Sequence, residues 1–356
     1  MVSTSSCFER GATARLFHHT QGNRNETLRI ACMLSAALLA WALSALALAQ
    51  PANPLPRSKT TRLILLGTQG GPGSTANRAE PANVVVVNGK PYLVDAGNGV
   101  VRQLTAAGIP FQSIRQIFIT HNHDDHNADW GTLMGRAWSL GQYQPMTVYG
   151  PRGTESMREG FLQYFAPNAA ARYMQGAANV PPAKVILARD IAGSGLVYQD
   201  ANVRVTAVEN CHYHFAKGSP GYGWQQSFAF RFETPDRRIV FSGDTGPCGD
   251  VLVKFAAGAD ILVHEVIDLA AIEAVLRTDV DRYPLPGQRD AILQHMRTEH
   301  STPEEVGRVA RAAGVRMVVL SHLVTGPKAQ ADDAYSQAVG KLYEGPVIVA
   351  HDLMEF

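Results

Sequence analysis

The segment HNHDDH at positions 121–126 constrains this chain more than any other, because it follows the apolar run IFIT and gathers three of the chain's 12 histidines beside two aspartates. At the end of a strand, side chains two residues apart point the same way, so His121 and His123 can bind one ion together. Asp125 and His126 follow on the turn and can reach a second ion. Imidazole and carboxylate are ligands that Zn²⁺, and also Mn²⁺ or Fe, accept. A histidine-rich surface tract or a helix cap is the weaker alternative.

Three further candidate ligands each stand at the end of an expected strand. His212 follows TAVEN, Asp244 follows IVFSG, and His322 ends VVLSH. Strand ends meet at one edge of a layered fold, so these side chains can converge on the first segment. The sequence therefore predicts two divalent metal ions, the first bound by His121, His123 and His212 and the second by Asp125, His126 and His322, with Asp244 bridging both.

Two of these assignments have alternatives. His212 follows its strand directly and is favoured over His214, which could instead line a pocket. Asp244 taken alone could be a backbone cap before a turn. Neighbouring aromatic residues could line the same pocket or simply pack in the core, and these are Tyr213, Phe215, Tyr222 and Trp224. Four other residues of ligand type are expected to be structural rather than catalytic, namely His264, His295, His351 and Asp352.

The rest of the chain reads as strands and helices that alternate within one α/β domain. A capping box at Thr302 and Glu305, with Pro303 in the first turn, predicts a helix that ends at Gly314. Two further helices are expected at 100–108 and near 154–165. The expected strands are 61–67, 83–89, 91–97, 114–120, 146–150, 203–210, 227–234, 238–244, 259–266, 315–322 and 346–352.

The order of these motifs resembles the metallo-β-lactamase superfamily over nearly all of residues 61–356. Within it, the segments LVDAGNGVVRQL, VYGPRG, ADILVHEV and EHSTPEEVGRVA are similar to the branch of tRNase Z and related arylsulfatase-like hydrolases. The resemblance implies a four-layer αββα sandwich and a dinuclear hydrolase site, usually with zinc. It also implies that His300 faces an oxygen of the substrate and is oriented by Glu265. The alternative is that His300 only begins a helix and Glu265 only caps a strand.

The expected activity is hydrolysis of an ester-type substrate, with phosphodiesters or aryl sulfates first. A hydroxide that bridges the two metals would attack the substrate. Asp125 would orient this hydroxide, and His300 would protonate the leaving group. One alternative is a lactonase or β-lactamase that acts on a cyclic acyl substrate. Another is a non-catalytic binding protein on the same fold.

The N-terminus predicts export. An apolar run from about residue 30 ends in Ala47-Leu48-Ala49, which favours a signal peptide at 1–49, followed by a lead-in at 50–60 and the hydrolase domain at 61–356. An uncleaved membrane anchor is the alternative, and it would be the only contact with a membrane. Cys211 and Cys248 would remain in a periplasmic or secreted protein, either as one disulfide or as two packed thiols.

Charge argues against a nucleic-acid partner. Without residues 1–49 the chain has 28 basic and 29 acidic residues. Residues 151–200 hold five basic and four acidic residues, so the chain shows no basic arm of the kind that tRNA processors carry. The expected partner is a small ester-like molecule, and a homodimer is left open.

Overall fold

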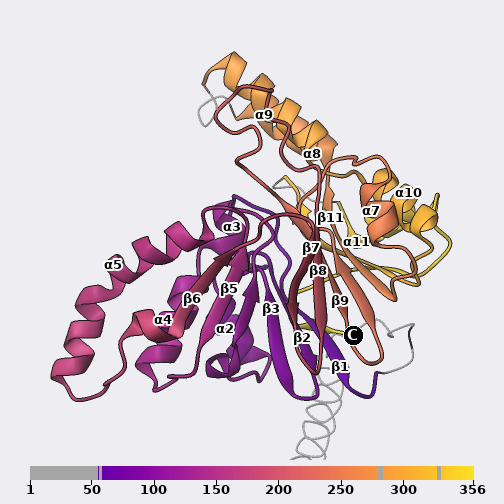
Figure 1. Ribbon diagram of the computed structural model, residues 1–356. Coiled ribbons are helices and arrows are strands. Elements are labelled where there is room, and N and C mark those ends of the chain that lie inside the picture. The colour runs from indigo at the N-terminus through magenta and orange to yellow at the C-terminus, as the bar shows by residue number, and fades with distance from the viewer. Residues whose placement is uncertain (1–54, 56–57, 280–283, 327–329) are drawn as a thin grey trace, which may run out of the picture. The chain divides into compact units, whose positions relative to one another are not determined.

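Two seven-stranded β-sheets form the centre of the computed structural model, which describes residue 55 and residues 58–279, 284–326 and 330–356 (Figure 1). The first sheet has the order β14-β1-β2-β3-β4-β5-β6 and the second has the order β13-β12-β11-β10-β9-β8-β7. The strands of the first sheet are β1 (Thr61–Gly67), β2 (Ala82–Val87), β3 (Lys90–Val94), β4 (Gln116–Phe118), β5 (Met146–Gly150), β6 (Ile186–Asp190) and β14 (Met354–Glu355). Those of the second are β7 (Gly195–Gln199), β8 (Arg204–Glu209), β9 (Phe228–Glu233), β10 (Arg238–Phe241), β11 (Ile261–Ile267), β12 (Val318–Val324) and β13 (Val347–Val349).

Alternation along the strands creates three apolar layers of packing. In β1, Leu63 and Leu65 pack between the two sheets, whereas Ile64 and Leu66 face the helices outside. The outer face of the first sheet is covered by α2 (Val100–Ala106), α4 (Trp130–Ser139) and α5 (Thr154–Met174), and that of the second by α7 (Val251–Phe255), α10 (Pro303–Ala313) and α11 (Asp332–Gly340). This arrangement confirms the predicted four-layer αββα sandwich.

The helix predicted from Thr302 is present as α10. The Thr302 hydroxyl accepts a hydrogen bond from the Glu305 backbone N–H, and the Glu305 carboxylate accepts one from the Thr302 backbone N–H. Gly314 ends the helix in the left-handed conformation at φ 60°. Short helical segments connect other elements, namely η1 (Phe111–Ser113), α3 (Asp124–Asn127) and α6 (Pro182–Val185).

Several elements were not predicted. Helix α5 continues to Met174, past both the expected end at 165 and Pro167. Helix α4 contains Gly131 and Gly135, which weaken helical propensity. An added Cβ at these glycines would lie 2.5 Å from the Phe161 ring and 2.8 Å from the Phe165 ring, so the glycines allow α4 and α5 to pack closely. Other elements absent from the prediction include β6, β7, β14, α7, α11, α8 (Leu269–Thr278) and α9 (Pro286–Thr298).

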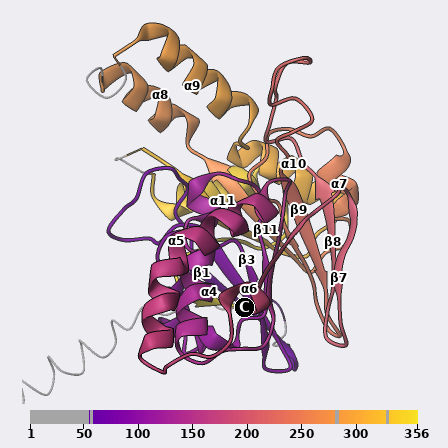
Figure 2. The ribbon, with the colours of Figure 1, turned by 60° about the vertical axis from the view of Figure 1, so that its left-hand side comes forward.

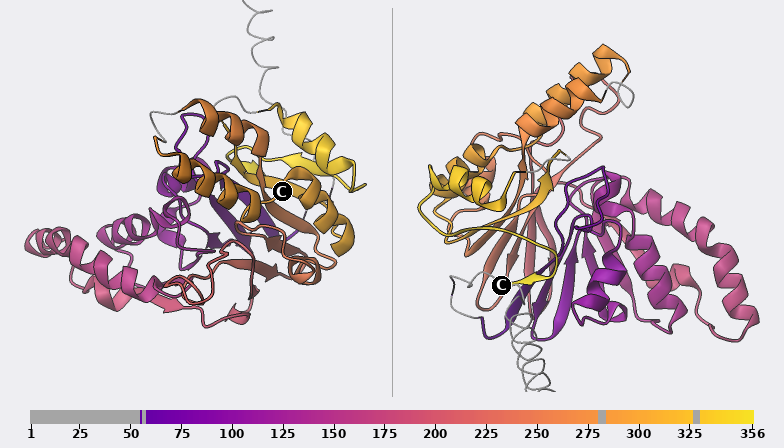
Figure 3. Two further views of the ribbon diagram at one scale, coloured as in Figure 1. Left: turned by 90° about the horizontal axis from the view of Figure 1, so that it is seen from above. Right: turned by 180° about the vertical axis from the view of Figure 1, so that it is seen from behind.

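Helices α8 and α9 form a hairpin that projects beyond the second sheet (Figures 2 and 3). In the part of the chain that the structure describes, no helix combines the length and the apolar character that crossing a membrane requires. The signal peptide expected at 1–49 lies outside the described residues and stays a prediction.

A partly buried hydrogen-bond network at Asp200 connects the two sheets. Its carboxylate accepts hydrogen bonds from Tyr92 of β3 at 2.8 Å and Tyr198 of β7 at 3.0 Å, and it pairs with Lys90. Burial alone would raise the pKa of Asp200, but the hydrogen bonds from Lys90, Tyr92 and nearby backbone N–H groups lower it below its usual range.

We expect Asp200→Asn to lower the free energy of unfolding at pH 7 by about 1–2 kcal/mol, because hydrogen bonds to a charged group are lost. The folded-state pKa of Asp200 lies below the unfolded value, so this stabilisation is complete above about pH 4 and is lost as pH falls below it. Urea unfolding of both proteins at pH 7 and pH 3 tests this. An equal difference at both pH values would contradict the role of the ionised carboxylate.

Candidate metal centre

The predicted ligands come from four separate parts of the chain and meet at one edge of the sandwich. They follow the ends of β4, β8 and β10 or, for His322, lie near the end of β12. His123 is half-buried, and the others are buried. Ring and carboxylate atoms of these residues form two groups within 4.8 Å, one of His121, His123 and His212 and one of Asp125, His126 and His322.

In the first group, three imidazole nitrogens converge. Nδ1 of His123 lies 3.0 Å from Nε2 of His121 and 3.1 Å from Nε2 of His212. A ring nitrogen carries either one lone pair or one proton. Nδ1 of His123 therefore cannot form full hydrogen bonds with both neighbouring nitrogens at once. Three lone pairs aimed at one point suit a shared cation.

Outer hydrogen bonds fix which nitrogen of each ring faces the centre. Nδ1 of His212 donates to the backbone carbonyl of Glu299 at 3.0 Å, so the lone pair is left on Nε2. Nδ1 of His121 lies 3.0 Å from the Thr120 hydroxyl, which itself donates to Asp95. Burial holds the pKa of both His121 and His212 well below the usual value and keeps both rings neutral.

In the second group, carboxylates alternate with imidazoles. Asp125 Oδ2 lies 3.2 Å from His322 Nε2 and 3.5 Å from His126 Nε2. Asp244 lies between the two groups, with Oδ2 3.2 Å from His322 and 3.8 Å from His121, and with Oδ1 3.4 Å from His126. The carboxylate at 244 can therefore contact ions in both groups.

Unpaired buried atoms show that these residues fit metal ions. Within the described chain, His126 Nε2 and Asp244 Oδ1 are buried without a hydrogen-bond partner, a costly state for polar atoms. Burial would lower the pKa of His126, but the carboxylates of Asp244, Asp125 and Asp95 outweigh it and raise that pKa well above the usual value. The site thus attracts positive charge, and its nitrogen and oxygen donors suit zinc, manganese or iron.

His300 and Glu265 lie together beside the metal-binding groups. His300 Nδ1 is 3.3 Å from Glu265 Oε2, and Glu265 Oε1 accepts the backbone N–H groups of Ser301 at 2.8 Å and Thr245 at 3.2 Å. Burial would lower the pKa of His300, but the charges of Glu265 and Asp244 raise it to about 9. Glu265 therefore fixes the orientation of a ring that lies within reach of His212 and Asp244.

Of the two alternatives after β8, the structure brings His212 into the first group and leaves His214 exposed. The other histidines expected to be structural differ in position. His264 is buried and bonds the Glu265 carbonyl, and His351 pairs with Asp332 at the surface. His295 of α9 lies near the centre, because its ring centroid is 5.4 Å from that of His300.

Asp95 is a site residue that sequence reasoning missed. Its carboxylate accepts from the Thr120 backbone N–H at 2.8 Å and lies 2.9 Å from Nδ1 of His126. It directly follows β3 and adopts a left-handed φ of 61°. An aspartate at a strand end before Ala-Gly was the available signal, the same kind of signal that singled out Asp244.

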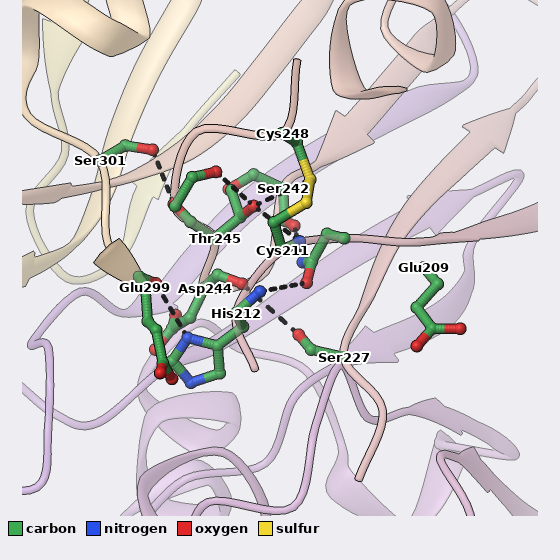
Figure 4. Close-up of a disulfide and its surroundings, with 12 residues drawn as sticks. Glu209, Cys211, His212, Ser227, Ser242, Asp244, Thr245, Cys248, Glu299 and Ser301 are labelled. Carbon is green, nitrogen blue, oxygen red and sulfur yellow. Dashed lines mark hydrogen bonds between the residues drawn. A yellow bond between two sulfur atoms is a disulfide. The ribbon is translucent and has the colours of Figure 1, made fainter. Parts of the chain in front are cut away.

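A disulfide between Cys211 and Cys248 joins the loops that carry His212 and Asp244 (Figure 4). The Cα atoms are 5.3 Å apart. The Gly246 backbone N–H also donates to the Cys211 carbonyl at 3.1 Å. Of the two alternatives for these cysteines, the structure has the disulfide.

Comparisons with known proteins place this site in a family context. A family model described as the beta-lactamase superfamily domain matches residues 91–323, a range that includes every predicted ligand. Ribonuclease Z of Mycolicibacterium gilvum is 30% identical over 296 residues, which cover 82% of this chain and 94% of that protein. Two solved structures share the fold. The metallo-beta-lactamase fold protein YhfI of Bacillus subtilis has a TM-score of 0.58 at 18% identity, covering 84% of this chain and 99% of that one. The short form of human tRNase Z has a TM-score of 0.56 at 22% identity, covering 83% and 98%.

We expect Asp244→Ala to reduce bound metal from two ions per chain to one or none, because the carboxylate between both groups is removed. Elemental analysis of protein purified without chelator measures this. Asp250→Ala is the matched control, since Asp250 is exposed and pairs only with Lys254 among the ion pairs of the described residues. Two ions retained in the Asp244 variant would contradict the bridging position.

Removing the disulfide with Cys211→Ser and Cys248→Ser together should destabilise the protein by about 4 kcal/mol, given the separation of 37 residues between the cysteines. The loop that carries His212 should also hold metal more weakly. Thermal unfolding and a zinc competition titration test both effects. Wild-type protein treated with reductant should behave like the double variant, and unchanged zinc affinity in both would show that the crosslink does not position His212.

Proposed function

Since the chain belongs to the metallo-β-lactamase superfamily, in its ribonuclease Z branch, we propose that it is an exported hydrolase that uses two divalent cations to cleave a small phosphodiester or aryl sulfate. The observation that carries this proposal is the position of Asp244 between two groups of three ligands. A binding protein without catalysis would not need two adjacent cation sites that share a carboxylate.

Two bound cations would supply Lewis acidity and a water with a lowered pKa. The chain's own residues then determine geometry. Asp125 is held in place because its Oδ2 accepts the Gly71 backbone N–H at 2.9 Å. His300, oriented by Glu265, is placed to donate a proton to the oxygen of the leaving group.

Two observations support export. The disulfide near the site favours an oxidising compartment, because cytosolic thiols are kept reduced. The apolar N-terminal run with its small-residue end has the composition of a signal peptide. The periplasm or the extracellular medium satisfies both.

We propose a small substrate, although the name ribonuclease Z indicates that the relatives act on RNA. The charge of residues 151–200 is nearly balanced, whereas binding of a phosphate backbone depends on an excess of cations. An exported enzyme would also be separated from precursor tRNA.

The proposal is tested with a panel of substrates, namely bis(p-nitrophenyl) phosphate, p-nitrophenyl sulfate, a homoserine lactone, nitrocefin and a precursor tRNA. We expect zinc-loaded protein to hydrolyse the phosphodiester, the sulfate or both. Turnover of only the lactone or nitrocefin would indicate acyl chemistry instead. Efficient cleavage of the precursor tRNA would contradict a small substrate.

His300→Ala should retain two metal ions but lower kcat by roughly 10²- to 10⁴-fold, since a general acid is lost. The loss should be largest for esters with poor leaving groups, which need protonation most. Metal content and kcat across a series of leaving groups give the answer. His351→Ala, at a surface histidine, is the control, and wild-type kinetics in the His300 variant would show that its assigned role is wrong.

A further inference from the structure

A cavity with apolar side chains in its walls lies beside the loop that contacts Asp125, and we propose that it binds the uncharged hydrocarbon part of the ester substrate. This inference rests on the proposed function and names its substrate class, which is an ester of an alkyl or aryl group rather than a nucleotide.

The cavity has a volume of about 380 Å³. It lies between the loop at 70–75, helices α8 and α9, and the end of β12. This volume falls at the lower end of the range for pockets that bind small molecules. The apolar side chains of its lining include Ile272, Val275, Leu276, Ile292, Met296 and Val324, and uncharged polar side chains come from Gln69, Ser74, Thr75 and Thr325.

Helical spacing explains how the α8–α9 hairpin forms this wall. Ile272, Val275 and Leu276 recur at the three- and four-residue spacing of one helix face, and Ile292 and Met296 do the same on α9. Each helix therefore presents an apolar stripe to the cavity. The same stripes also allow α8 and α9 to pack against each other.

The loop at 70–75 forms one wall of the cavity and also contacts the segments that carry the metal-binding groups. The Gly71 backbone N–H donates to Asp125, and a Cβ added at Gly71 would lie 2.2 Å from that carboxylate, so the loop rests directly on it. The Gly70 backbone N–H donates to the carbonyl of Leu323, the residue after His322. On the other side, Met296 follows His295, whose ring lies beside His300. In the proposed arrangement the reacting centre lies at the metals and the hydrocarbon part of the substrate passes this loop to enter the cavity.

The charge of the lining selects against polyanions. Among the described residues that line the cavity, Asp279 is the only charged one, and none is Lys, Arg or His. A nucleotide chain would bring phosphates to a wall whose described residues include no cation, whereas binding of nucleic acid depends on cationic contacts. A hydrocarbon group gains free energy by leaving water for this wall.

The test uses p-nitrophenyl alkyl phosphodiesters whose alkyl chain grows from methyl to octyl. With wild-type zinc-loaded protein, kcat/KM should rise roughly fourfold per added methylene until the cavity is full. Ile292→Trp fills the cavity and should abolish this increase of kcat/KM with the length of the alkyl chain. Gln294→Trp is the matched control, because Gln294 is exposed on the same helix and does not line the cavity.

Calorimetric binding of methylphosphonate and octylphosphonate separates this inference from the proposed function. Tighter binding of the octyl compound that is lost in Ile292→Trp supports a hydrocarbon site, even if no ester is hydrolysed and the proposed function fails. Equal binding of both compounds overturns the inference. Hydrolysis of the methyl ester without any dependence on chain length also overturns it and leaves the proposed function standing.

Discussion

The structure depends on placing the carboxylate of Asp244 among imidazoles at the buried edge of an apolar sandwich. A buried carboxylate is costly unless opposite charge or hydrogen bonds surround it. His126, His322 and His121 all lie within 3.8 Å of it, the first and last from the segment after β4 and His322 from β12. The contacts that offset the free-energy cost of burying the Asp244 carboxylate also bring the ligands together. Folding stability and metal binding therefore depend on the same arrangement of side chains.

Groups that do not themselves reach the centre hold the ligands in position. Asp95 and Thr120 orient the rings of His126 and His121, and the Glu299 carbonyl orients His212. The backbone of Gly71 holds Asp125. For the three histidines, these groups contact the ring nitrogen that faces away from the centre, which fixes the donor atom that faces the ion. The disulfide adds a covalent constraint between the loops of His212 and Asp244.

Local spacing and residue type were enough to predict the fold class and the group of ligands that converge. The spacing of His121, His123 and Asp125 is a property of one turn, and the capping box at Thr302 is a property of one helix start. Features that depend on distant packing were not predictable in this way. The glycines of α4 make sense only against the phenylalanines of α5, and the apolar stripes of α8 and α9 only against each other and the loop at 70–75. The sequence could not decide whether the disulfide forms, because it does not give the distance between the two Cα atoms.

The metal-binding groups and the cavity contribute differently to the selection of a substrate. The metal-binding groups can polarise many esters, since nothing in their donor atoms distinguishes RNA from a small molecule. Discrimination must then come from the walls, where the non-reacting part of the substrate lies. The described lining of the cavity combines apolar and uncharged polar side chains with one carboxylate, which suits the proposed hydrocarbon group better than a chain of phosphates. Under the proposed function, a protein of the ribonuclease Z branch would act on a different class of ester without any change in the ligands themselves.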